Sequence, residues 1–226
     1  LVCLQETKLD VVDRFLVMQF IGPSLDGFDY LPASDTRGGI ILAWDTTIMQ
    51  VDKISRDTNF MTGLVHNKDG SSWWISVVYG PQGDDLKLQF LTDLQQWRAT
   101  CPGPWMVLGD FNMIVNATEK NNCNLNQHIM RKFREFMEEN ELKELYMHGR
   151  RFTWTNERDD PVMTKIDRVL VTVGATREES AEKMEVETMA TAAAKTTTRR
   201  PSSGRCSASA RWRASRPPAA SSSRPT

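Results

Sequence analysis

Polar side chains stand where four apolar runs of this sequence end, and their types are those that bind metal ions and phosphates. They are Glu6 after "VCLQ", Tyr79 after "ISVV", Asp110 and Asn112 after "MVLG", and Asp167 within "KIDRVLV". In layered α/β folds, ligands collect at strand ends, so we expect these side chains to converge on one cleft.

Carboxylates that converge in one cleft repel one another unless a cation lies between them. Oxygen ligands of this kind suit Mg²⁺ or Mn²⁺ better than zinc. Such a site fits the hydrolysis of a phosphate ester, in which the metal neutralises charge on the phosphoryl oxygens and one carboxylate activates water. Asn and Tyr side chains would donate hydrogen bonds to the non-bridging oxygens.

Each of these residues also has an ordinary structural interpretation. An acidic residue at a strand end more often forms a turn or caps a helix. Asn112 taken singly is more often part of an Asx-turn than a ligand, and Tyr79 before Gly-Pro is more often a half-buried aromatic at the end of a hairpin. Their joint occurrence favours the catalytic interpretation without excluding the structural one.

The segments that carry these residues have strand patterns. Apolar runs bounded by turn residues predict strands over residues 1–7, 38–45, 105–112, 150–161 and 163–171. Residues 61–81 have the pattern of a β-hairpin with its turn at Asp69-Gly70. Because alternate residues of a strand face the same way, Asp110 and Asn112 are predicted to share a face while Phe111 turns into the protein.

Two helices are predicted between the strands. Asp84 or Asp85 caps the first, whose apolar face is Leu86, Phe90, Leu94 and Trp97. The second covers residues 127–140, with a stripe of Ile129, Met130, Phe133, Phe136 and Met137. Strand pairs and strand–helix alternation in one body predict an α/β layered fold with mixed sheets.

The chain changes in composition after Val171. Residues 1–171 carry 18 Lys and Arg against 24 Asp and Glu, whereas residues 172–226 carry 10 against 5. Ala, Ser, Thr and Arg fill 36 of the last 55 positions, which include no Leu, Ile or Phe. A segment so poor in apolar residues is predicted to be disordered, because it buries too little surface to offset its chain entropy. The domain prediction is therefore one folded unit, residues 1–171, followed by a low-complexity tail.

Cysteine spacing and hydropathy argue against metal-stapled, disulfide-rich and membrane-spanning classes of protein. The four cysteines form no CxxC pair and no regular spacing, which argues against a zinc site or a disulfide framework. No apolar run approaches the length that spans a bilayer, so we expect no membrane partner.

Five motifs resemble, in order and spacing, the endonuclease domain of LINE-type (non-LTR) retrotransposons, as found in plant genomes. They are "LQETK" (4–8), "VYGP" (78–81), "GDFN" (109–112), "RRFTWTN" (150–156) and "KIDRVL" (165–170). That domain belongs to the exonuclease–endonuclease–phosphatase superfamily, with the apurinic endonucleases and DNase I. The resemblance covers about residues 1–171 and implies a four-layer α/β sandwich, two mixed sheets face to face between helices.

The resemblance also implies an activity and residue roles. The activity is Mg²⁺-dependent (or Mn²⁺-dependent) nicking of one DNA strand, which exposes a 3′ hydroxyl that primes reverse transcription. Glu6 matches the metal-binding glutamate, Asp110 the aspartate that orients or deprotonates water, Asn112 and Tyr79 the phosphate contacts, and Asp167 the aspartate that orients a histidine. Thr153 matches a threonine at the DNA-binding edge, where Asn156 also lies, and Lys120 is a further candidate for a DNA phosphate, although an exposed loop lysine is the commoner case. A nuclear location and a reverse transcriptase downstream are implied by the family alone.

The sequence departs from the family pattern at both ends. The chain opens on Leu1 inside an apolar segment, after the position of the family's Asn-bearing first strand, and no histidine follows Asp167, where the family has Ser-Asp-His. We therefore expect an incomplete domain with little or no activity, and a tail that is either translated off-frame or a genuine disordered segment. Losing one charge-stabilising donor costs about 10² to 10³ in rate.

Two other functions stay open from the sequence. One is a phosphatase of the same superfamily acting on a small phosphate ester, against which "LPASDTRGGIILAW" speaks, because that string resembles the retrotransposon branch. The other is a non-catalytic nucleic-acid-binding protein, supported by the arginines of the tail and by Trp212, which could stack on a base.

Overall fold

The structure is a computed structural model that describes residues 1–34, 37–147, 151–156 and 158–173. The chain divides into two compact units, residues 1–193 and 194–226, and the second unit lies wholly outside the described residues. The tail predicted from residue 172 onward therefore also lies outside them, apart from its first two residues. Thr172 ends a strand, and the Val173 amide donates to the carbonyl of Glu141 over 3.1 Å.

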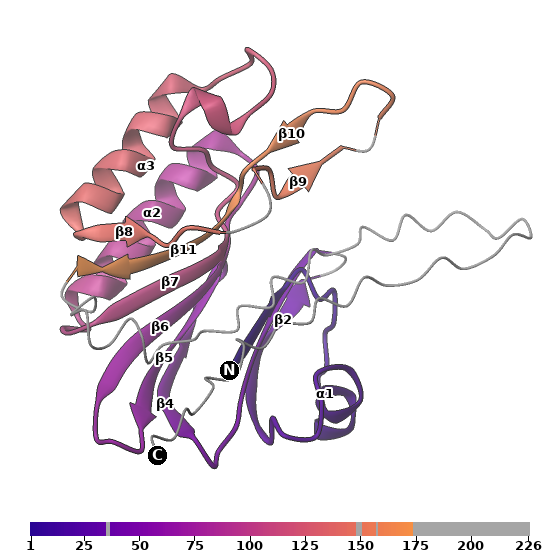
Figure 1. The fold of residues 1–226 in the computed structure, drawn as a ribbon, viewed down its shortest axis with the longest axis vertical. Helices are drawn as coiled ribbons and strands as arrows, with labels where there is room; N and C mark the ends of the chain where they lie inside the picture. The colour runs from indigo at the N-terminus through magenta and orange to yellow at the C-terminus, as the bar shows by residue number, and fades with distance from the viewer. Residues whose placement is uncertain (35–36, 148–150, 157, 174–226) are drawn as a thin grey trace, which may run out of the picture. The chain divides into compact units, whose positions relative to one another are not determined.

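Two β-sheets form the centre of the first unit (Figure 1). The smaller sheet is antiparallel, with the order β1 (Val2–Gln5), β3 (Arg37–Trp44) and β2 (Gly27–Ser34). The larger sheet has six strands in the order β4 (Met49–Arg56), β5 (Phe60–Asn67), β6 (Ser72–Tyr79), β7 (Trp105–Asp110), β11 (Asp167–Thr172) and β8 (Leu142–Glu144). Only β6 and β7 pair in parallel, so the larger sheet is mixed.

Alternating side chains pack the two sheets against each other. In β3, Ile40 and Leu42 face the larger sheet, whereas Ile41 and Ala43 face away from it. The larger sheet contributes inward residues from five strands, among them Val51, Met61, Val65, Ile75, Val77, Met106, Leu108, Val169 and Val171. The period of two along each strand thus produces one apolar layer between the sheets and another outside each sheet.

Helices cover both outer faces (Figure 1). The short α1 (Arg14–Phe20) buries Val17 against the smaller sheet. On the other side, α2 (Asp84–Ala99) and α3 (Gln127–Glu139) cover the larger sheet around an aromatic core of Phe60, Phe90, Trp105, Phe111, Phe133 and Phe136. Helix, sheet, sheet and helices make four layers, which confirms the predicted α/β sandwich.

Several predicted elements are confirmed. Residues 61–81 form the hairpin of β5 and β6, whose turn is closed by a 3.0 Å hydrogen bond from the Gly70 amide to the Asn67 carbonyl. Asn126 caps α3 by accepting from the Ile129 amide, and the predicted stripe of that helix is buried apart from the partly buried Met137.

The prediction for the first helix was wrong in two details. Gly83 is the N-cap, and Asp84 and Asp85 lie in the first turn, where the helix dipole favours carboxylates. Leu86, which was predicted to lie on the buried face, is 61% exposed. Leu91, which was not predicted there, is buried in the core instead. The reason is that Leu91 adjoins Phe90 and Leu94 on the face toward the sheet, whereas Leu86 lies in the first turn on the solvent side.

The segment 150–171 also differs from its predicted pair of strands. It forms two-residue strands β9 (Trp154–Thr155) and β10 (Met163–Thr164), which pair with each other, and then β11. The strand breaks at Lys165-Ile166, where the chain stops pairing with β9 and starts pairing with β7. The elements α1, β2, β4 and β8 were not predicted, although β2 and β4 have eight residues each, because their order depends on pairing and packing within the layers.

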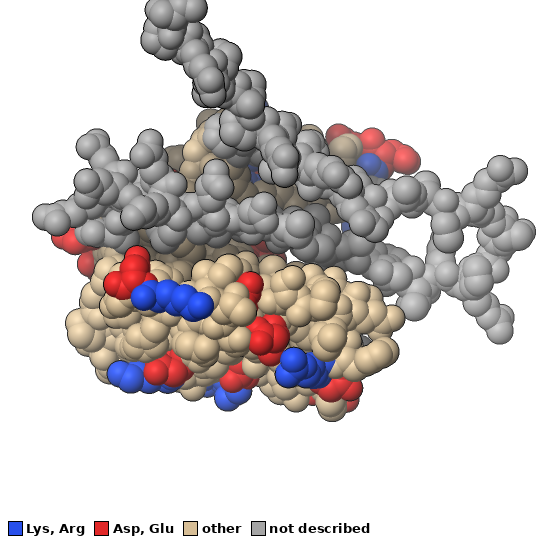
Figure 2. Space-filling view, turned by 60° about the horizontal axis from the view of Figure 1, so that its bottom comes forward, with Lys and Arg blue, Asp and Glu red and all other residues tan. Residues whose placement is uncertain are grey.

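The charged side chains on one face of the protein are mixed in sign (Figure 2). On the face shown in Figure 2, acidic and basic side chains are interspersed among uncharged residues and do not gather in a patch of one sign. Among the described residues, no helix is long and apolar enough to cross a membrane.

Candidate active site

Three of the predicted residues form a row across the end of the larger sheet. Tyr79 is the register partner of Asp110 across β6 and β7, and Asp110 is the register partner of Asp167 across β7 and β11. Register partners on neighbouring strands point to the same face of a sheet. Because Met106 and Leu108 of β7 pack between the sheets, Asp110 and its two partners point toward the space between the sheets, at its rim. We call Tyr79, Asp110 and Asp167 the strand-end row.

Glu6 approaches the row from the smaller sheet. It follows the last residue of β1, a strand that packs against β6 and β7, and it has a left-handed backbone with φ of 54°. The next residues are held by hydrogen bonds from the Thr7 amide to the Gly39 carbonyl (3.2 Å) and from the Lys8 amide to the Gly38 carbonyl (3.1 Å). A side-chain carbon at Gly38 would lie 3.9 Å from the ring of Tyr79, so the two sheets meet beside the row.

The environment of Asp167 disfavours its charged form. Burial raises the pKa of its carboxyl group above the ordinary value, and the nearby charge of Glu6 raises it further. Hydrogen bonding to Thr153 and the charge of Arg168 oppose this rise without reversing it. The Thr153 hydroxyl oxygen also accepts from the amides of Ile166 and Asp167, each over 3.0 Å, so Thr153 fastens the start of β11.

The backbone at Asn112 departs from the predicted strand. The strand β7 ends at Asp110, and Asn112 has a left-handed φ of 52°. The prediction that strand alternation puts Asp110 and Asn112 on one face is therefore wrong. A turn joins them instead: the Asn112 amide donates to Oδ1 of Asp110 over 2.7 Å, and Nδ2 of Asn112 donates to the Gly80 carbonyl over 2.7 Å. Phe111 packs on the helix side of the larger sheet, not between the sheets.

A close approach of two strand ends makes this turn possible. The Gly80 amide donates to the Asp110 carbonyl over 2.6 Å, and a side-chain carbon at Gly80 would lie 2.4 Å from the Phe111 carbonyl oxygen. Only glycine allows the backbones after Tyr79 and Asp110 to come so near. Tyr79, Asp110 and Asn112 are thus held in one backbone arrangement.

The three residues predicted to contact DNA occupy different positions. Thr153 lies beside Asp167, as described above. Asn156 closes the loop between β9 and β10, where its Oδ1 accepts from the Val162 amide over 2.9 Å. Lys120 donates from Nζ to the Asn124 carbonyl over 2.8 Å. The structure therefore brings Thr153 to the row and leaves Asn156 and Lys120 in neighbouring loops.

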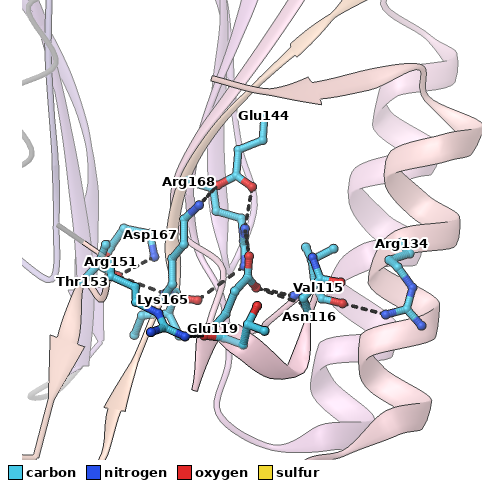
Figure 3. Close-up of polar contacts among 12 residues, drawn as sticks. Val115, Asn116, Glu119, Arg134, Glu144, Arg151, Thr153, Lys165, Asp167 and Arg168 are labelled. Carbon is cyan, nitrogen blue, oxygen red and sulfur yellow. Dashed lines mark hydrogen bonds and ion pairs between the residues drawn. The ribbon is translucent and has the colours of Figure 1, made fainter. Parts of the chain in front are cut away.

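One charged residue next to the row was not predicted from the sequence. Arg168 follows Asp167 in β11, and its fully buried side chain lies between Glu119 and Glu144 (Figure 3). It also lies over the ring of Phe133. The signal that could have found it is a charged residue inside the apolar run "IDRVLV", where an arginine needs buried partners. Among the described histidines, His66 lies at the far end of β5 and His128 on α3, so neither reaches the row.

The donors at the row fit a hard divalent cation. Within the described ranges, no group of three or more His, Cys, Asp or Glu side chains is gathered tightly enough to hold a metal ion. Mg²⁺, however, usually takes one or two protein carboxylates and completes its shell with water and substrate phosphates. Glu6 and Asp110 supply carboxylate oxygens from opposite sheets, which is the ligand chemistry such an ion prefers.

The sequence matches a known protein family over most of its length. The profile of the endonuclease/exonuclease/phosphatase family matches residues 1–187, which include every residue of the row. The chain belongs to this family. Members of the endonuclease/exonuclease/phosphatase family generally depend on a divalent metal, in keeping with the oxygen donors at the row. No curated protein matches the chain in sequence.

Several solved structures share the fold. One is a variant of the 3′ phosphatase NExo from Neisseria bound to product DNA hairpin, with 16% identity, a TM-score of 0.58 and coverage of 76% of each chain. Another is the endonuclease domain of TRAS1, a telomere-specific non-LTR retrotransposon, with 12% identity, a TM-score of 0.53 and coverage of 68% of this chain and 70% of that one. The catalytic domain of Xenopus laevis APE2 follows with 15% identity, a TM-score of 0.51 and coverage of 76% and 73%.

Proposed function

We propose that this chain is a LINE-type endonuclease that hydrolyses a phosphodiester in DNA with the help of a divalent metal. The observation that carries the proposal is the strand-end row, in which Tyr79, Asp110 and Asp167 are register partners on three neighbouring strands. Glu6 faces the row from the other sheet. A phenol and three carboxylates therefore lie at one rim, and such groups are rare in an ordinary core.

The proposed roles follow from these positions. Asp110 is the base that orients and deprotonates the attacking water, while Tyr79 and Asn112 donate hydrogen bonds to the phosphate. Glu6 would hold Mg²⁺ or Mn²⁺, which when bound supplies positive charge for the phosphoryl oxygens. Asp167 orients a histidine in the family resemblance, and among the described residues no histidine lies beside it.

Thr153 holds Asp167 in place and lies at the DNA-binding edge, with Asn156 and Lys120 in the adjoining loops.

DNA is the proposed substrate. The relatives named above include a phosphatase bound to a DNA hairpin and the endonuclease domain of a retrotransposon, which supports a nucleic-acid partner. We further propose a nuclear location and a reverse transcriptase as the partner that uses the nicked end. The weak activity expected from the sequence stays a prediction.

Nicking of supercoiled plasmid by the full chain tests the proposal. We expect slow conversion to open circles with Mg²⁺, none with chelator, and loss of the reaction in Glu6→Ala. Asp52→Asn is the matched control, because Asp52 is an exposed acidic residue paired with His66 at the far end of the sheet. Folded protein that nicks no faster than Glu6→Ala would contradict the proposal. Release of a 3′ phosphate without nicking would favour the phosphatase alternative.

A further inference from the structure

Arg168 forms a buried ion network on the helix side of the larger sheet (Figure 3). Its Nη1 lies 2.7 Å from Oε2 of Glu144 and 3.1 Å from Oε1 of Glu119, and its Nη2 donates to Oε2 of Glu119. The guanidinium lies over the ring of Phe133, 5.6 Å from its centroid. Burial raises the pKa of Glu119, but the hydrogen bond and charge of Arg168, together with the amides of Val115 and Asn116, outweigh the burial, so the pKa is lowered.

One arm of this network holds the loop that follows the Asp110 turn. Oε2 of Glu119 accepts from the amides of Val115 (2.7 Å) and Asn116 (3.2 Å), which closes the short helix η1 (Ala117–Glu119). Arg134 of α3 donates to the Val115 carbonyl over 2.6 Å. The chain leaving Asp110 and Asn112 is therefore tied, through Glu119, to the guanidinium of Arg168.

The other arm holds the segment that leads into Asp167. The Lys165 amide donates to the Glu119 carbonyl over 2.8 Å, and the Lys165 ammonium lies 2.6 Å from Oε1 of Glu144. The Ile166 carbonyl accepts from the Phe111 amide over 2.9 Å, which links this segment directly to the residue after Asp110. Both carboxylates of the row thus have backbones that are joined to the same network.

We propose that Arg168 is a positioning residue, which holds the Asp110 and Asp167 carboxylates in their side-by-side arrangement from the opposite face of the sheet. Successive residues of a strand point to opposite faces, so Arg168 orients Asp167 without touching it. A buried ion pair adds little net stability compared with an apolar core, and its clearest effect is to select one geometry. A planar guanidinium suits this task, since its donors lie in a rigid fork that contacts both glutamates at once.

Amide hydrogen exchange on the full chain tests the positioning without reference to activity. In Arg168→Met, we expect exchange at Phe111, Ile166 and Asp167 to accelerate at least tenfold more than at Val171, farther along the same strand. Arg98→Met is the matched control, because Arg98 lies over the ring of Trp105 at the other end of β7 and donates to loop carbonyls there. It should leave exchange at the row unchanged.

Two results would overturn the proposal: exchange that accelerates equally at all amides, or exchange that does not accelerate at the row. Either would mean that Arg168 is an ordinary core residue. Arg168→Lys keeps the charge but loses the fork, so it should fall between the wild type and Arg168→Met. Should Arg168→Met fail to fold, Glu144→Gln is the second variant, with the same pattern expected at smaller amplitude.

The effect of Arg168 on catalysis rests on the proposed function and is measured in a separate experiment. In folded Arg168→Met, we expect kcat for nicking to fall at least tenfold with KM within twofold, whereas a merely structural loss would scale with the unfolded fraction. An unchanged kcat would show that the positioning by Arg168 does not contribute to catalysis. A wild type that does not nick overturns the proposed function instead, and the exchange result still decides whether Arg168 positions the row.

Discussion

Asp110 and Asp167 are direct register partners across β7 and β11, so two carboxylates lie side by side at the rim of the sandwich. Such a pair is unfavourable in an ordinary fold, because like charges repel and burial penalises both. For Asp167 the pKa is raised, first by burial and also by the nearby charge of Glu6. Charged groups kept together at such a cost are candidates for a functional site.

Asp110→Asn tests the role of the base. We expect the nicking rate to fall by about 10² to 10⁴, the typical contribution of general acid–base catalysis. The fold should be retained, because the new side-chain oxygen can still accept from the Asn112 amide. Plasmid nicking and the thermal midpoint measure the two effects. A rate within threefold of the wild type would show that Asp110 is not the base.

Asp167→Asn should increase the free energy of unfolding at pH 7. Because the pKa of Asp167 is raised in the folded state, the fold disfavours its charged form, and this cost is present at pH values above the raised pKa. The cost disappears as the pH falls through that pKa toward the ordinary value near 4. The gain from the substitution should therefore shrink with acidification. Denaturant titrations at several pH values measure it, and a loss of stability at pH 7 would contradict this account.

Arg168→Met should decrease the free energy of unfolding by about 3–5 kcal/mol, because it leaves the Glu119 carboxylate without its cationic partner. Lys132→Met is the comparison. Lys132 pairs with Glu135 over 2.7 Å on the exposed side of α3, where such a pair contributes less than about 1 kcal/mol. Urea denaturation of both variants gives the difference, and equal losses would mean that burial does not distinguish the two pairs.

Gly109→Ala should destabilise the protein more than Gly103→Ala. Both glycines have a positive φ, +134° and +109°, so alanine is strained at either position by roughly 1–3 kcal/mol. Only at Gly109, next to Asp110, would the added carbon also meet backbone, 2.1 Å from the Val78 carbonyl oxygen. At Gly103 there is nothing within 4 Å. We expect a further loss of about 1–3 kcal/mol for Gly109→Ala in denaturant titrations. Similar losses for both would show that β6 and β7 can separate locally.

The sequence predicted the elements whose own pattern is strong. The stripe of α3 and the hairpin of β5 and β6 repeat a period over enough residues to be recognised locally. The segment 150–171 was harder, because its strands are two residues long or change partners at Ile166. Leu86 was placed in the core for a related reason: apolar spacing identifies a face but not where that face meets the sheet.

The sequence by itself determined which residue types are available for phosphate chemistry and on which segments they lie, because composition and periodicity are local properties. Only the tertiary structure decided that Tyr79, Asp110 and Asp167 share one level of the sheet, since register is set by pairing between segments far apart in the chain. The same is true of Arg168, whose partners Glu119 and Glu144 lie in other segments and meet it only when β8, η1 and β11 pack together.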